Sequence, residues 1–227
     1  MFGLDHRIAT FSNGTTLLVV VGVSVLLGLR HASDPDHLAA VTTMIASGKE
    51  RATRRAARLG FTWGLGHATS LFAFGLPVIF YSAYLPAPVE KAAETSVGFM
   101  IVLLSLLLLL RWRRGAYRHT AVHTHATRTG LQAYGIGLVH GMGGTAGVGL
   151  LLLATIPSRM LAVAALTIFA FCTALSMAAL STGFGLALAS APVRRSFHVL
   201  APALGGASLA FGVWYALGAQ GLVPYVF

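Results

Sequence analysis

Six apolar stretches, each long enough to cross a bilayer, constrain the fold of this 227-residue chain more than any other feature. A helix needs roughly 20 residues to cross a hydrocarbon core about 30 Å thick. The stretches are Thr16–Ala46, Leu59–Leu85, Thr95–Trp112, Leu131–Ile156, Met160–Ser190 and His198–Leu222. Charged residues make up only 10 % of the chain, whereas a soluble domain carries about a quarter. The sequence therefore predicts an all-α integral membrane protein with six transmembrane helices, surrounded by the lipid bilayer.

The basic residues between the stretches indicate which way up the chain sits. Twelve of them lie in alternate connections: Lys49, Arg51, Arg54, Arg55, Arg58, Arg111, Arg113, Arg114, Arg118, Arg128, Arg194 and Arg195. The other side carries only Arg7, Lys91 and Arg159. By the positive-inside rule this asymmetry predicts cytoplasmic basic loops and both termini outside, in the inner (plasma) membrane. The net charge of +10 is thereby explained without a nucleic-acid partner.

Charged residues occur inside the first apolar stretch, where they are costly. Arg30, Asp34 and Asp36 lie between runs of leucine and alanine, and His31 and His37 accompany them. Each such charge costs on the order of 3 kcal/mol to insert, so these residues usually face a cavity and serve a function.

Pro35 interrupts the same stretch and predicts a break in its helix. A proline removes one backbone hydrogen bond and clashes with the preceding turn. On an ideal helix His31, Asp36 and His37 would point in different directions. A break would let them converge, and the length of the stretch leaves room for one. The fifth stretch is also long enough to be tilted, kinked or broken.

Two more histidines at membrane depth, His67 and His140, have glycine neighbours that permit close helix packing. Imidazole and carboxylate ligands suit Ni²⁺, Co²⁺ or Zn²⁺. The single cysteine, Cys172, excludes a cysteine-based zinc site and an internal disulfide. The predicted metal ligands are His31, Asp36, His37, His67 and His140. The ion is expected to be cargo, and no prosthetic group is predicted.

Other interpretations of these residues stay open. A single buried histidine is often only a hydrogen-bonded contact between helices, and the first-stretch cluster could be a structural kink in which Arg30 pairs with Asp34. Three further histidines, His119, His123 and His125, lie in a basic loop. They fit a weak metal-collecting tract or a solvated loop equally well.

A faint internal repeat links the two halves of the chain. A shift of 109 residues places Gly28–His31 over Gly137–His140. The same shift pairs Asp36 with Thr145 and His67 with Ser176. With three stretches in each half, the halves would cross the membrane in opposite senses. The inverted repeat is typical of secondary transporters, whose site lies near the midplane where the repeats meet.

The chain is therefore expected to be one transporter domain over residues 1–227. Repeat one would cover about 16–112, a basic histidine-containing loop about 111–130, and repeat two about 131–222. Residues expected next to the site or along the pathway are Arg30, Asp34, Thr145 and Ser176.

Three segments resemble motifs of a known family. Arg30–His37, R-H-A-S-D-P-D-H, resembles the R-H-A-x-D-x-D-H signature of the nickel/cobalt transporter family. Leu65–Ser70, L-G-H-A-T-S, is similar to its second motif, L-G-H-[ST]-[ST]. His140–Gly147, H-G-M-G-G-T-A-G, resembles the H-G-x-x-G-[ST] segment of its shorter branch, the membrane proteins similar to the urease accessory protein UreH.

The resemblance implies transport of Ni²⁺ or Co²⁺ and a link to the maturation of nickel enzymes such as urease or hydrogenase. It implies that His31, Asp36, His37 and His67 are essential. The longer members carry an F-D-T-A-T-E motif, where Phe171–Ser176 here reads F-C-T-A-L-S.

The expected function is secondary transport of a divalent metal ion, with import favoured. No G-x4-G-K-[ST] motif for ATP hydrolysis occurs. The alternatives are a metal exporter, a metal-binding subunit or sensor that needs a partner, and, as the weakest, an intramembrane metalloenzyme. Whether the chain acts as a monomer or as a homo-oligomer is left open.

Overall fold

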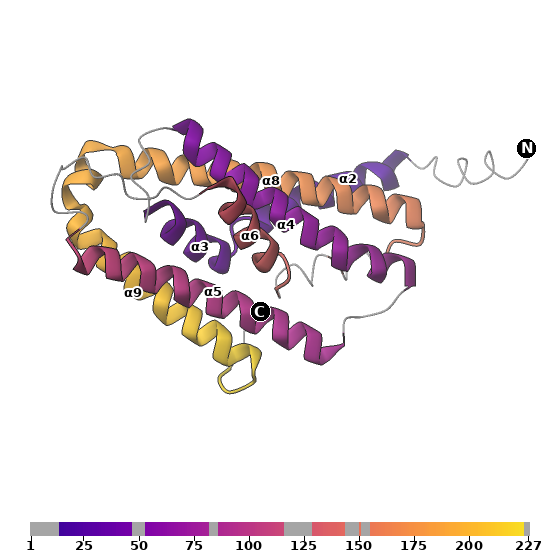
Figure 1. The fold of residues 1–227 in the computed structure, drawn as a ribbon. Coiled ribbons are helices and arrows are strands. Elements are labelled where there is room, and N and C mark those ends of the chain that lie inside the picture. Colours follow the sequence, from indigo (N-terminus) through magenta and orange to yellow (C-terminus); the bar gives the residue numbers. More distant parts are fainter. Residues whose placement is uncertain are drawn as a thin grey trace, which may run out of the picture.

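A computed structural model describes residues 14–46, 53–81, 86–115, 129–143, 150 and 155–224. Within these ranges the regular structure consists of seven helices (Figure 1). They are α2 (Gly14–His31), α3 (Pro35–Ala46), α4 (Thr53–Tyr81), α5 (Ala87–Arg113), α6 (Gly130–His140), α8 (Arg159–Ala189) and α9 (Ala191–Ala219). The prediction of an all-helical membrane protein is confirmed at this level.

Four of the helices, α4, α5, α8 and α9, are long and apolar enough to cross a membrane. Helices α2 and α3 pass the same test only as a pair, bent by 51° at the short break between them, so the candidate spans number five if this pair is one span. The break predicted from Pro35 is thus confirmed. The fifth stretch is not broken, because α8 is one helix of 31 residues.

The described residues do not reach the predicted count of six spans. The stretch Leu131–Ile156 was expected to form one crossing, but α6 ends at His140 after 11 residues. That is about 16 Å of helix, too short for a bilayer. Gly141, Met142 and Gly143 follow as a turn, because glycine is a poor helix former. Residues 144–149 and 151–154 lie outside the described part.

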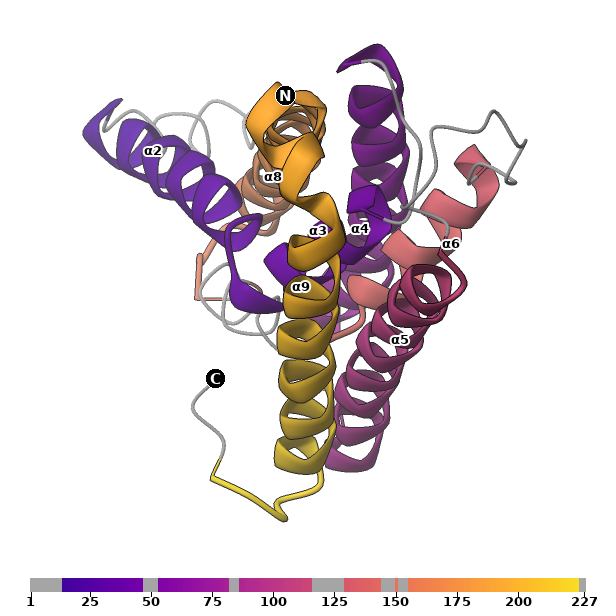
Figure 2. The same cartoon turned by 90° about the vertical axis from the view of Figure 1, so that its left-hand side faces the viewer.

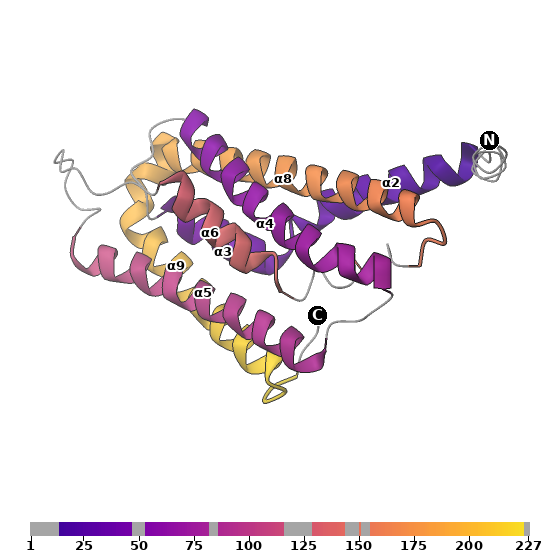
Figure 3. The same ribbon diagram turned by 45° about the vertical axis from the view of Figure 1, so that its right-hand side comes forward.

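The long helices form two antiparallel pairs, α4 with α8 and α5 with α9, with the short helices α3 and α6 between them (Figures 1 and 3). Figure 2 shows α5 and α9 side by side along their length. The ends of α3, α5 and α8 and the starts of α4 and α9 gather at one end of the bundle, at the left of Figure 1.

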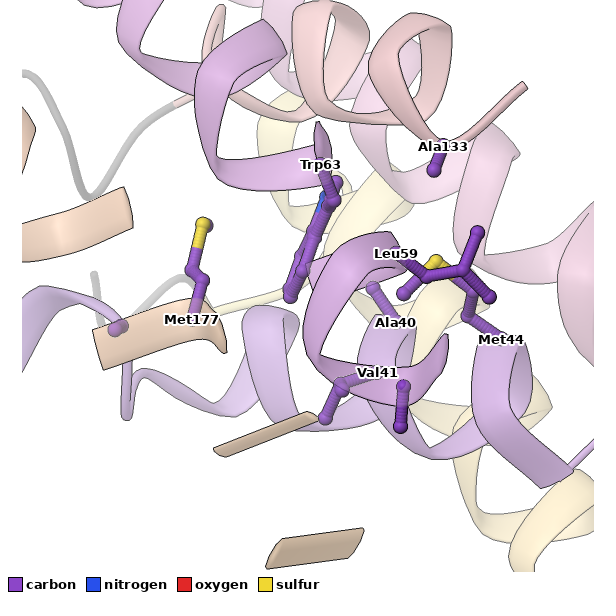
Figure 4. Packing of buried hydrophobic residues seen from close by; sticks show 9 residues of the cluster. Ala40, Val41, Met44, Leu59, Trp63, Ala133 and Met177 are labelled. Atoms are coloured by element: carbon purple, nitrogen blue, oxygen red, sulfur yellow. The ribbon is translucent and has the colours of Figure 1, made fainter. Parts of the chain in front are cut away.

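A buried apolar cluster fills the space between α3, α4 and α8. The indole of Trp63 lies at its centre, with Met177 of α8 on one side and Leu59, Ala40 and Met44 on the other (Figure 4). Trp63 and Met177 are at most 1 % exposed. This packing fixes α4 and α8 around the helix that carries the acidic motif.

Each half contributes a helix that packs on the other half through a glycine. Gly28 of α2 faces the backbone of Phe169 and Thr173 on α8. Gly137 of α6 faces the backbone of Trp63 and His67 on α4. Helices α2 and α6 run in opposite directions (Figures 1 and 3).

Candidate metal site

The break after α2 brings the acidic motif together. The amide N–H of Asp34 donates to the carbonyl of His31 at 3.2 Å, and that of Leu38 donates to the carbonyl of Asp34 at 3.0 Å. Pro35 opens α3, a position where its missing N–H costs nothing. His31 thus ends one helix, whereas Asp36 and His37 lie in the first turn of the next.

Four histidine rings from four helices meet at this break. His31 of α2, His37 of α3, His67 of α4 and His140 of α6 are all at most 5 % exposed. The His37 ring centroid lies 4.7 Å from that of His31, 5.0 Å from that of His67 and 4.2 Å from that of His140. The structure thereby brings together the four histidines among the predicted ligands. The fifth predicted ligand, Asp36, contacts these rings through hydrogen bonds.

Two carboxylates orient the rings. Asp34 Oδ2 lies 3.2 Å from Nδ1 of His31. Asp36 accepts twice, with Oδ1 at 3.1 Å from Nδ1 of His37 and Oδ2 at 3.1 Å from Nε2 of His140. An ionised carboxylate can only accept hydrogen bonds, so in neutral rings these three nitrogens carry the protons. Carboxylates in this position hold metal-binding histidines in one tautomer.

The remaining nitrogens of neutral rings carry lone pairs. Nε2 of His31 and Nε2 of His67 are 2.9 Å apart, so His67 donates to His31 and keeps a lone pair on Nδ1. Within the described residues, the buried atoms His37 Nε2, His67 Nδ1 and His140 Nδ1 have no hydrogen-bond partner. A buried polar atom without a partner is costly, and a lone pair of this kind is what a borderline metal ion binds.

The ligand atoms satisfy the spacing of a metal site in two combinations. His31, His37 and His67 form one group, and Asp36, His37 and His140 form the other. Within each group the ligand atoms lie within 4.8 Å of one another.

Glycines make the approach of α6 to α4 possible, as their positions in the sequence predicted. A Cβ on Gly137 would collide with the carbonyl oxygen of Trp63, and one on Gly66 with that of Tyr134. The hydroxyl of Ser70 donates to the carbonyl of Leu138 at 2.6 Å, which ties the two helices together beside the histidines.

The residues expected around the site take different places. Asp34 pairs with His31, whereas Arg30 is exposed, so the pairing of Arg30 with Asp34 is not what the structure shows. Ser176 is half-buried and lines a groove of α8 with Ala179 and Gly183. Thr145 lies outside the described residues, as do the loop histidines His119, His123 and His125.

Three residues around the site escaped the sequence analysis. The Trp63 ring packs on His37 and His140 with centroids at 5.7 and 5.6 Å, and the Phe169 ring packs on His31 at 5.5 Å. The backbone of Thr173 faces Gly28 in the same way that the backbone of His67 faces Gly137. Trp63 precedes His67 by one helical turn, a spacing that could have identified it.

Comparison with known proteins fits these observations. The profile of a family described as high-affinity nickel-transport protein (NicO) matches residues 17–135. That range contains His31, Asp36, His37 and His67, and ends before His140. The chain is also 27 % identical over 209 residues to the urease accessory protein UreH of Bacillus sp. (strain TB-90), with 88 % of this chain and 91 % of that protein covered. No solved structure matches.

The family match covers more than half of the chain, and the UreH match covers nearly all of it. Both describe transport or accessory membrane proteins rather than enzymes, which sets the metalloenzyme alternative aside. By the range and nature of these matches, the chain belongs to the family of high-affinity nickel-transport proteins.

Proposed function

We propose that this chain carries Ni²⁺ across the inner membrane as a secondary transporter, with His31, Asp36, His37, His67 and His140 as the ligands of the ion in transit. One observation carries the proposal: four buried histidines from four helices meet, and three of their nitrogens have no partner within the described residues. A structural histidine has its nitrogens satisfied by protein or water.

The electrostatics suit a divalent cation. The carboxyl groups of Asp34 and Asp36 lie against the histidine rings. A buried charge is tolerated when it is paired and hydrogen-bonded. Carboxylates in this position would offset the charge of an ion that exchanges its water for imidazole nitrogens.

The family match supports Ni²⁺ as the cargo. Co²⁺ is the second candidate cargo, by resemblance to the nickel/cobalt transporters.

We further propose import, driven by the membrane potential. An inside-negative potential favours entry of a divalent ion by about 4.6 kcal/mol per 100 mV, twice the value for a single charge. The basic loops would face the cytoplasm and the termini the outside. The name of the UreH relative supports delivery of the metal to maturation of a nickel enzyme such as urease.

The opposite courses of α2 and α6, each packed on the other half through a glycine, support an inverted repeat as the architecture. We infer that the site lies where the repeats meet, near the bilayer midplane, as in other secondary transporters.

Metal flux into proteoliposomes tests the proposal. Ni²⁺, Co²⁺, Zn²⁺ and Mn²⁺ are compared for the native chain, for His37→Ala and for His198→Ala, which removes an exposed histidine outside the cluster. We expect saturable Ni²⁺ flux, lowered more than tenfold in His37→Ala and kept in His198→Ala. Unchanged flux in His37→Ala would contradict the proposed site. Binding without flux would favour the alternative of a subunit or sensor that needs a partner.

A further inference from the structure

The two groups of candidate ligands have one residue in common. His37 belongs to both, whereas His31 and His67 occur only in the first and Asp36 and His140 only in the second. The His67 and His140 ring centroids are 6.2 Å apart, the widest of the histidine ring contacts around the site. The ligand atoms therefore define two overlapping positions for an ion rather than one position with five equal ligands.

The two positions differ in where they lie in the fold. The first is built from α2, α3 and α4, all from the first half of the chain. The second joins α3 to α6, the first helix of the second half. An ion that moves from the first to the second position thus moves from one half to the junction between the halves.

His37 can serve only one position at a time. Its Nδ1 lies 3.1 Å from Asp36 Oδ1, and its Nε2 has no partner in the described part of the chain. A neutral imidazole has one nitrogen lone pair, and one lone pair binds one ion. The lone pair is on Nε2 while Asp36 accepts from Nδ1, and it must be on Nδ1 for His37 to bind an ion together with Asp36. The two positions are consequently exclusive.

We propose that the transported ion occupies two positions in succession, first among His31, His37 and His67 and then among Asp36, His37 and His140, and that the two positions are never filled at once. This inference rests on the proposed transport function. The order follows from import if the first position faces the outer side, where α2 begins.

The chemistry of the two positions supports a stepwise transfer. The first offers three neutral imidazoles with Asp34 behind His31, and the second offers two imidazoles and a carboxylate oxygen. A second position next to the first keeps the ion among protein ligands in a medium that solvates ions poorly. It also avoids one site so tight that the ion could not leave.

Nickel K-edge X-ray absorption of the purified full-length chain loaded with Ni²⁺ tests the inference, because it counts imidazole ligands. Removal of the first position by His67→Ala or His31→Ala should leave one bound ion with two imidazoles and a carboxylate oxygen. Removal of the second by His140→Ala or the isosteric Asp36→Asn should leave one ion with three imidazoles. His37→Ala should bind no ion, and His198→Ala should match the native chain.

Flux in proteoliposomes is measured on the same variants. Each single variant that keeps a bound ion should lose Ni²⁺ flux by more than tenfold, because an ion in one position has nowhere to pass. The bound ion itself shows that such a variant is folded, and two variants for each position guard against one that is not.

Two results would overturn the inference and leave the transport function standing. One is loss of the ion from both His67→Ala and His140→Ala although the native chain binds and transports it, which indicates a single site. The other is native flux in either variant. A native chain that neither binds nor transports Ni²⁺ would instead refute the proposed function itself.

Discussion

At the scale of single residues, Asp34 contacts the candidate site through another side chain. Its Oδ2 lies 3.2 Å from Nδ1 of His31, and it belongs to neither group of candidate ligands. Under the proposed function it would position His31 for the ion, as carboxylates behind metal-bound histidines do.

Asp34→Ala is expected to weaken Ni²⁺ binding by about 10–100-fold, the usual effect of losing such a partner. Titration calorimetry of the purified protein measures the change. Glu90→Ala removes an exposed acid from the first turn of α5 and is the matched control. Equal affinities of Asp34→Ala and the native chain would show that His31 needs no orientation by Asp34.

The protonation of the histidines predicts how binding depends on pH. Metal and proton compete for the same imidazole lone pairs, so a lower pH must weaken binding. We expect the Ni²⁺ dissociation constant to rise as the pH is lowered, measured by calorimetry in buffers of different ionisation enthalpy. A dissociation constant that falls as the pH is lowered would contradict imidazole ligands.

The residues that the structure brings together at the candidate site were largely predictable from the sequence, but the surroundings of the site were not. Asp36 and His37 stand out because charged and polar residues in an apolar stretch are conspicuous. Trp63 and Phe169 do not, because an aromatic residue in a membrane helix has many possible partners. Thr173 was missed because a uniform shift of 109 residues pairs His67 with Ser176. In the structure the backbone of Thr173 faces Gly28 as the backbone of His67 faces Gly137, so the residue that corresponds to His67 lies three positions earlier on α8.

At the scale of helices, α6 shows what hydropathy cannot predict. An apolar window does not reveal where a helix ends, and the glycines that follow His140 end α6 inside the stretch. The break before Pro35 was predictable, because proline acts through its own ring and missing N–H. Glycines elsewhere in the chain lie inside helices, so glycine alone does not mark the end of a helix. Where α6 ends therefore depends also on packing, which the sequence does not show.

Two glycines of α6 provide a matched test of its packing on α4. A Cβ on Gly137 would collide with the Trp63 backbone, whereas one on Gly135 meets no described atom within 4 Å. Gly137→Ala should lower the free energy of unfolding by about 1–3 kcal/mol and weaken Ni²⁺ binding. Gly135→Ala should be neutral or stabilise the helix by up to about 1 kcal/mol.

Thermal unfolding in detergent, with and without Ni²⁺, measures both effects. If the two glycine variants unfold alike, the close approach of α6 to α4 does not determine the geometry of His140.

Helix α3 carries the shared ligand and is the shortest membrane-embedded piece of the first half. It contacts α5, α8 and α9, and the break at its start joins it to α2 through a three-residue turn. Because Asp36 and His37 lie in its first turn, a small movement of α3 would move both groups of ligands at once.

At the scale of the whole molecule, the predicted orientation can be read with cysteine labels. After replacement of Cys172 by alanine, Ser12→Cys should react with a membrane-impermeant maleimide added outside intact cells. Arg114→Cys, exposed after the end of α5, should react only after the membrane is opened. The opposite pattern would invert the topology and, with it, the proposed order of the two ion positions.

The glycine contacts of α2 and α6 have a consequence for the chain as a whole. Helix α2 packs on α8, and helix α6 packs on α4. Each half of the chain therefore has one long helix whose surface is covered by a helix from the other half. Neither half alone would have a complete interior. Cut between α5 and α6, the gene should yield two fragments that are degraded when made singly and that reassemble into a working protein when made together.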